Sequence, residues 1–101
     1  MEILKIISSF YSIEYIKGLR DTDNNRLAGQ IDYRIKKVSV ERNIPRQKQL
    51  QTIIHEILHG ISEELGIPMN EKFVRAVSRA MLCVILDNPW FFKEVLRNAK
   101  I

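Results

Sequence analysis

The amino-acid sequence predicts an α+β domain in which a small antiparallel sheet, built by the N-terminal strands, precedes three helices. Over the first forty residues the apolar side chains come in short β-branched and aromatic runs, and after Asn43 they recur at helical spacing. The chain has 101 residues, of which 46% are hydrophobic and 28% are charged, as expected for a globular domain with its own core. We therefore expect residues 1–101 to form a single minimal domain.

Four strands are predicted before the first helix. Ser8 and Ser9 separate the first two strands as a hairpin turn would, and a polar, aperiodic loop at residues 20–26 precedes the third. A tight turn near Lys36 joins the third strand to the fourth. The predicted strands cover residues 2–7, 11–16, 29–35 and 37–40.

The rest of the chain predicts three helices. Apolar side chains recur every three or four residues from Pro45 to Leu65, and Gly66 then ends the pattern as a helix C-terminus should. Asn70 is a favourable N-cap for the second helix. Asn88-Pro89 opens the third helix, because proline is preorganised for a first helical turn.

Several classes of protein are excluded by the composition. The longest apolar run, Met81–Leu86, is far shorter than the roughly 20 residues that span a bilayer. Residues 1–9 contain an early acid and no small-residue cleavage site, so we expect no secretory signal and a cytoplasmic location, the host cytoplasm for a phage protein. Cys83 is the only cysteine, which excludes an internal disulfide and a cysteine-only zinc site, and we expect it to be inert.

Positive charge is concentrated in one segment. The chain carries 16 Lys and Arg against 12 Asp and Glu, a formal net charge of +4. No zinc finger, zipper or aromatic RNA-binding signature accompanies the basic residues, so a solvated surface is the first interpretation and a patch for an acidic protein or nucleic acid is the alternative. The clustered cations are Arg34, Lys36, Lys37, Arg42, Arg46 and Lys48.

The strongest chemical signal lies inside the first predicted helix. The only two histidines stand four residues apart in His55-Glu56-Ile57-Leu58-His59. Residues at this spacing lie on one face of a helix, about 6 Å apart along its axis, so both imidazoles can bind one zinc ion. Glu56 is then placed to act as the general base toward a zinc-bound water. At ordinary composition the pattern arises by chance in on the order of one in a few hundred chains of this size.

The position of the histidines on the helix agrees with a metal site. On a helical wheel, His55 and His59 fall outside the apolar stripe of the helix. Two core histidines with satisfied hydrogen bonds would lie within that stripe. We therefore expect a helix whose back packs on the domain and whose front faces a cleft.

The third protein ligand is expected to be a carboxylate, because a catalytic zinc site needs three protein ligands and the chain has no third histidine. Glu63 and Glu64 follow on the same rigid helix, so they are expected at the surface. Glu71 opens the second helix and is the preferred candidate. Its alternatives are a favourable interaction with the helix dipole or a pair with Arg75, and binding a shared metal would require a steep crossing of the two helices. Asp87 and Glu94 are the remaining candidates.

These motifs resemble the small phage and prophage zinc metallopeptidases of the ImmA/IrrE-like group. The resemblance covers most of residues 29–92 and rests on His-Glu-Ile-Leu-His-Gly, Glu-Glu-Leu-Gly-Ile, Asn-Glu-Lys-Phe-Val, Leu-Asp-Asn and Gly-Gln-Ile-Asp-Tyr. It implies a zincin-like helix, zinc held by His55, His59 and Glu71, and Glu56 as the general base. The helix-turn-helix region that such proteins often carry has no room in 101 residues, so a free-standing peptidase domain is implied, acting on a phage or host regulator.

Smaller features complete the predicted site. The strand that begins at Gly29 is a candidate edge strand that would receive a substrate peptide as an added strand. An electrophile besides zinc is needed to stabilise the transition state. Tyr33, Arg75 and Arg79 are available, and Arg75 is the candidate electrophile. The aromatic residues at 90–92 are expected to close the core. The candidate substrate-binding residues are Gly29, Gln30, Ile31 and Tyr33.

The sequence thus predicts zinc-dependent hydrolysis of a peptide bond in a protein or peptide substrate. Neither nucleic acid nor a membrane is an expected partner, and the oligomeric state is not predicted. The alternative is a non-catalytic interaction module, with or without zinc, that binds an acidic protein or nucleic acid through residues 34–48. A third possibility is a degenerate peptidase that binds zinc without turnover.

Overall fold

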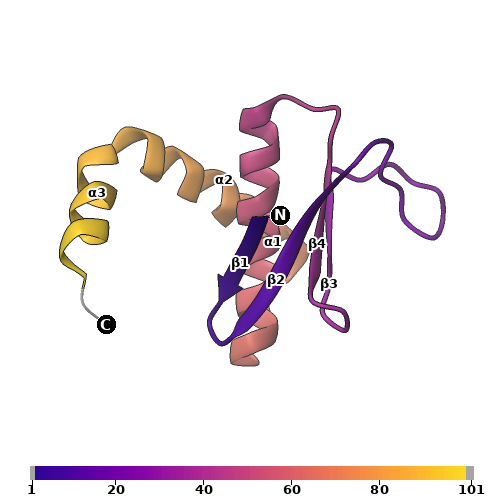
Figure 1. Ribbon diagram of the computed structural model, residues 1–101, viewed down its shortest axis with the longest axis horizontal. Helices are drawn as coiled ribbons and strands as arrows, with labels where there is room; N and C mark the ends of the chain where they lie inside the picture. The colour runs from indigo at the N-terminus through magenta and orange to yellow at the C-terminus, as the bar shows by residue number, and fades with distance from the viewer. Residues whose placement is uncertain (1, 100–101) are drawn as a thin grey trace.

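A four-stranded sheet covered on one face by a long helix forms the body of the protein (Figure 1). The structure is a computed structural model that describes residues 2–99. This arrangement confirms the predicted α+β class. The elements are β1 (Glu2–Ile6), β2 (Ser9–Ile16), β3 (Gly29–Asp32), β4 (Lys37–Glu41), α1 (Arg46–Leu65), α2 (Glu71–Asp87) and α3 (Pro89–Asn98).

The sheet is mixed, with strand order β1-β2-β4-β3, rather than antiparallel throughout as expected. β1 pairs with β2 and β3 pairs with β4 in antiparallel fashion, as the two predicted hairpins require. β2 and β4 are parallel. The difference arises because residues 17–28 carry the chain past the position of β4, so that β3 forms the outer edge and β4 returns between β3 and β2.

β3 is shorter than the alternating pattern suggested. The Asp32 carboxylate accepts hydrogen bonds from the backbone N–H groups of Arg34 and Ile35, at 3.0 and 3.2 Å. These bonds start a turn that residue 36 completes in the left-handed region, with φ of 57°. The local side-chain bonds compete with strand pairing, and β3 therefore ends at Asp32.

The hydrophobic core lies between the sheet and α1. Its buried residues come from β1, β2, β4 and α1. Gly60 lets α1 approach β1 closely, since a β-carbon at this position would lie 2.8 Å from Cδ1 of Ile6. The contact fixes which face of α1 is turned away from the sheet. The buried cluster comprises Ile6, Tyr11, Val38, Val40 and Ile53.

α2 runs crosswise to α1, as Figure 1 shows. Gly66 ends α1 in the left-handed conformation, with φ of 66°. The Asn70 side chain then accepts a hydrogen bond from the Phe73 N–H at 2.8 Å, which confirms the predicted N-cap. This sharp reversal places the first turn of α2 beside the middle of α1.

α3 lies outside the core, so the expectation for residues 90–92 is wrong. Trp90 is 67% exposed and Phe91 is 49% exposed, and α3 has no buried residue. The aromatic rings pack edge to face on one another instead. The reason is geometric, because α3 continues from the distal end of α2 and packs against that helix away from the sheet (Figure 1). Cys83 on α2 is exposed as well.

Among residues 2–99, no helix combines the length and the apolar character needed to cross a bilayer.

Candidate metal centre

The two histidines of α1 present their rings side by side. Their ring centroids are 5.0 Å apart and their planes meet at 61°. Both side chains are about one-fifth exposed, so they border an opening and are not sealed in the core. The α-helical spacing of four residues and the close packing of α1 on the sheet together direct them toward α2.

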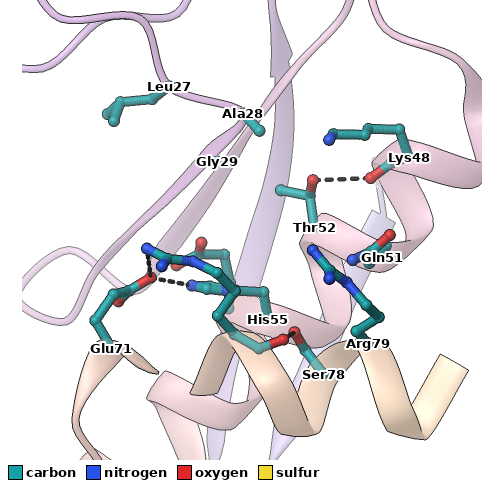
Figure 2. Close-up of a pocket in the computed structure, with 12 residues that line it drawn as sticks. Leu27, Ala28, Gly29, Lys48, Gln51, Thr52, His55, Glu71, Ser78 and Arg79 are labelled. Carbon is teal, nitrogen blue, oxygen red and sulfur yellow. Dashed lines mark hydrogen bonds and ion pairs between the residues drawn. The ribbon is translucent and has the colours of Figure 1, made fainter. Parts of the chain in front are cut away.

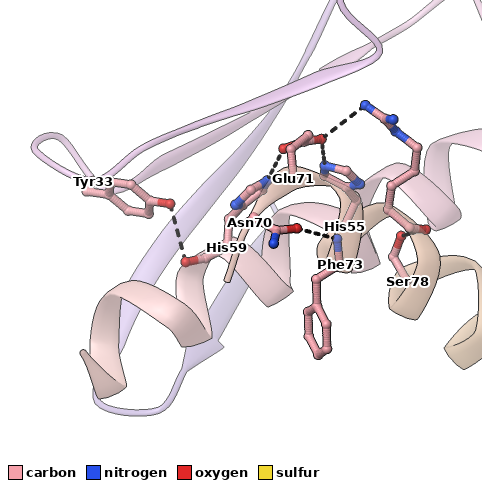
Figure 3. A network of polar contacts seen from close by, with 8 residues as sticks. Tyr33, His55, His59, Asn70, Glu71, Phe73 and Ser78 are labelled. Carbon is pink, nitrogen blue, oxygen red and sulfur yellow. Dashed lines mark hydrogen bonds and ion pairs between the residues drawn. The ribbon is translucent and has the colours of Figure 1, made fainter. Parts of the chain in front are cut away.

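Glu71, the first residue of α2, bridges the two imidazoles. Its Oε1 atom lies 2.8 Å from His55 Nε2, and its Oε2 atom lies 2.9 Å from His59 Nε2 (Figure 3). The crosswise course of α2 supplies the steep crossing that this contact required. The glutamate that the sequence favoured as third ligand therefore lies with both histidines.

The donor set fits a zinc ion. One ligand atom from each of His55, His59 and Glu71 lies within 4.8 Å of the others, and two imidazoles with one carboxylate are a common catalytic set. Zinc binds imidazole and carboxylate ligands at about 2.0–2.2 Å, so an ion among them requires the carboxylate to withdraw from its present contacts with the imidazoles. Among the described residues, no other group of this kind is found.

The other carboxylates considered as ligands lie elsewhere. Glu63 is exposed, and Glu64 pairs with Lys36 at 3.8 Å and is mostly buried, not at the surface as expected. Glu94 on α3 pairs with Arg97. Asp87 is exposed at the distal end of α2.

Burial favours the neutral form of the His55 imidazole. Removal from water lowers the pKa of His55 from its ordinary value of 6.5, and this effect outweighs the carboxylate of Glu71, which raises it. A metal ligand must be the unprotonated imidazole. The site therefore presents His55 in its ligating form around neutral pH.

Glu56 is buried between α1 and β3, and its side chain borders a cavity that Glu71 also lines. Only 6% of the residue is exposed, and burial, followed by the nearby charge of Glu71, raises the pKa of its carboxyl to about 7. The absence of a side chain at Gly29 makes room for it, because a β-carbon there would lie 3.3 Å from Oε2 of Glu56. A carboxyl group with a pKa near 7 can accept and release a proton at neutral pH.

A cavity of about 300 Å³ joins these groups. It lies between the segment that leads into β3, the outward face of α1 and the first turns of α2, and His55, Glu56 and Glu71 line it (Figure 2). The cavity is open to solvent on one side.

The residues proposed to bind substrate are placed differently from one another. Gly29 lines the cavity, whereas Gln30 is exposed and Ile31 packs against the core. The Tyr33 hydroxyl donates a hydrogen bond to the His59 carbonyl oxygen at 3.3 Å (Figure 3). β3 lies at the edge of the sheet, so its backbone has one unpaired edge. This backbone edge, and not the side chains of β3 as a group, is available for pairing with an extended segment.

Of the three candidate electrophiles, Arg75 is the one that pairs with the side chain of a candidate ligand. Its Nη2 atom is 3.8 Å from Oε1 of Glu71, and the residue lines the cavity. Arg79 lines the cavity farther along α2. Burial raises the pKa of Tyr33, whose hydroxyl is already bonded to the backbone of α1.

Sequence reasoning did not single out two residues that shape the cavity, Thr52 and Ser78. The Thr52 hydroxyl donates to the Lys48 carbonyl oxygen at 2.8 Å, and Ser78, 1% exposed, donates to the Arg75 carbonyl oxygen at 3.1 Å. Counting back from Glu56 by one helical turn would have found Thr52. Nothing comparable in the sequence marks Ser78.

The basic residues of the segment 34–48 are not gathered in one place. Its members divide between the two ends of β4, and three of them are already paired. Lys36 pairs with Glu64, Lys37 with Glu14, and Arg46 with Glu2.

No family model, curated protein or solved structure matches this chain.

Proposed function

We propose that this protein is a zinc-dependent peptidase, and that His55, His59 and Glu71 hold the metal. The observation that carries the proposal is the bridge of Glu71 between the two imidazoles, with the buried Glu56 opening onto the same cavity. The resemblance to the ImmA/IrrE-like peptidases and a cytoplasmic location belong to this proposal.

Zinc, when bound, would polarise the carbonyl of the scissile bond and make a water molecule acidic enough to lose its proton near neutral pH. Glu56 accepts that proton, and the raised pKa of about 7 suits it to give the proton to the leaving amine. Water thus adds across the peptide bond, with its hydroxyl on the acyl carbon and its protons on the carboxyl and amine products.

The remaining residues orient the substrate and stabilise charge. An extended peptide added to the free edge of β3 would be held by backbone hydrogen bonds alongside the cavity. The guanidinium of Arg75 is placed to stabilise negative charge that develops on the carbonyl oxygen.

Cleavage of fluorescein-labelled casein by the zinc-loaded protein tests the proposal. Glu56→Gln is expected to retain zinc and to reduce the cleavage rate by at least about a hundredfold, because it removes the proton acceptor while keeping its volume. Glu63→Gln alters an exposed glutamate of the same helix and is the matched control, expected to cleave normally. Equal cleavage by the Glu56→Gln and unaltered proteins would contradict the proposal.

A further inference from the structure

Cations without acidic partners line the far end of the candidate active-site cavity. Lys48 precedes His55 by two turns of α1, about 10 Å, and Arg79 follows Glu71 by two turns of α2, about 12 Å. Figure 2 shows Arg79 and Lys48 on the side of the cavity away from Glu71. Neither cation forms an ion pair with any residue in the range 2–99.

A second cavity continues the basic character on the other side of the segment that leads into β3. It has a volume of about 420 Å³ and shares Leu27 and Ala28 with the first cavity. Lys17, Arg20 and Arg26 line it, and within the described part of the chain none of them pairs with a carboxylate. The shared wall makes the two basic cavities neighbours along one surface.

Two of the three acids that line these cavities already have partners, and the third is the buried Glu56. The Glu41 carboxylate accepts hydrogen bonds from the backbone N–H groups of Gly18, Leu19 and Asn43, at 3.2, 2.8 and 2.9 Å. Glu71 bridges the two histidines. Six cationic side chains and three carboxyl groups line the two cavities, so this surface carries a net positive charge.

We propose that the substrate is an acidic polypeptide segment, with carboxylate side chains that contact Lys48 and Arg79 in the first cavity and Lys17, Arg20 and Arg26 in the second. This inference rests on the proposed peptidase function, because it takes the bound segment to be cleaved. Several exposed ion pairs, each worth up to about 1 kcal/mol, together favour an acidic segment over its neutral isostere by about tenfold.

A polypeptide fits this surface better than a nucleic acid. Proteins that bind single-stranded nucleic acid combine cations with aromatic side chains that stack on the bases. No Phe, Tyr or Trp among the described residues lines either cavity. The free edge of β3 offers instead the backbone donors and acceptors that pair with an extended peptide.

Two pools of quenched fluorescent peptides test this inference. Both pools have the same randomised centre, flanked by Asp and Glu in one pool and by Asn and Gln in the other. The zinc-loaded protein is expected to cleave the acidic pool with a kcat/KM about tenfold higher, mostly through KM. Raising the salt concentration to about 1 M is expected to remove most of the preference, because the Debye length falls to about 3 Å.

Charge reversal locates the preference in the cavity. Lys48→Glu combined with Arg79→Glu is expected to abolish or invert the preference for the acidic pool. Both side chains belong to exposed residues, so the core is left intact. Arg34→Glu combined with Lys93→Glu changes the net charge equally at exposed positions outside both cavities, and is expected to retain the preference.

A binding measurement distinguishes the case in which this inference is wrong from the case in which the peptidase proposal is wrong. Fluorescence anisotropy of the two pools with the Glu56→Gln protein reports affinity without cleavage. Tighter binding of the acidic pool, with no cleavage by the unaltered protein, would retain the inference and refute the peptidase. Equal cleavage of both pools would overturn the inference alone. It is also overturned if neither pool binds, or if a single-stranded oligonucleotide binds more tightly than the acidic pool.

Discussion

The carboxylate of Glu56 lies against the backbone of Gly29, so closely that a β-carbon on this glycine would be 3.3 Å from Oε2 and would overlap Cγ2 of Thr52. The edge strand therefore contributes no side chain of its own where it meets the helix that bears both histidines. The close approach is what places the buried carboxylate at the edge of the cavity.

Gly29→Ala is expected to destabilise the fold by about 1–3 kcal/mol, because the added methyl group has to displace Thr52 from a packed position. Urea denaturation of the metal-free protein measures this loss. Thr52→Ser removes the obstructing methyl group and keeps the hydroxyl that donates to Lys48. In the Thr52→Ser background the cost of Gly29→Ala should fall to less than half, and an unchanged cost would refute the proposed contact.

The buried Glu56 should make the metal-free protein less stable as the pH rises. Its pKa is raised from its ordinary value of 4.5 to about 7 in the folded state, so the folded state binds more protons than the unfolded state between these values. Stability due to this group is therefore full below about pH 4.5 and is lost as the pH rises through 7, by up to about 3 kcal/mol.

His55 contributes the opposite slope at lower pH. Its pKa is lowered on folding, so stability rises with pH until the unfolded histidine is neutral, above about 6.5. The difference in unfolding free energy between the unaltered and Glu56→Gln proteins isolates the glutamate. Measured in EDTA from pH 5 to pH 8, this difference should fall steadily, and a constant difference would show that Glu56 is not buried as described.

Residues packed between the sheet and α1 should contribute more to the free energy of unfolding than residues on α3. Ile6 is 3% exposed and packs over Gly60, so Ile6→Ala is expected to cost about 2–5 kcal/mol. Leu96 on α3 is 84% exposed, and Leu96→Ala should change the free energy of unfolding by less than about 0.5 kcal/mol. Denaturation midpoints of the two variants decide this, and a large loss from Leu96→Ala would mean that α3 is covered in solution.

The sequence alone predicts those features that depend on interactions between residues close together in the chain. The spacing of His55 and His59 fixes their common face whatever surrounds the helix, and Asn70 caps α2 through a bond to a residue three positions away. The strand pairs β1–β2 and β3–β4 follow from short connections in the same way. These features were therefore predictable from the sequence.

Relationships that depend on how elements cross were not predictable. The contact between Glu71 and His59 requires a crossing of α1 and α2 that the residues of the short connection do not specify. The parallel pairing of β2 with β4 depends on the path of a long loop. The apolar character of Trp90 and Phe91 suggested burial, but α3 starts too far from the sheet to reach it.

The zinc content of the purified protein, measured by elemental analysis after dialysis against zinc and then against buffer, tests the central claim most directly. We expect about one zinc per chain in the unaltered, Glu56→Gln and Glu63→Gln proteins, and at least about tenfold weaker retention after His59→Ala or Glu71→Ala, because each removes one of three ligands. Absence of zinc from the unaltered protein would contradict the account. It would also be contradicted if the His59→Ala and Glu71→Ala variants retained as much zinc as the unaltered protein.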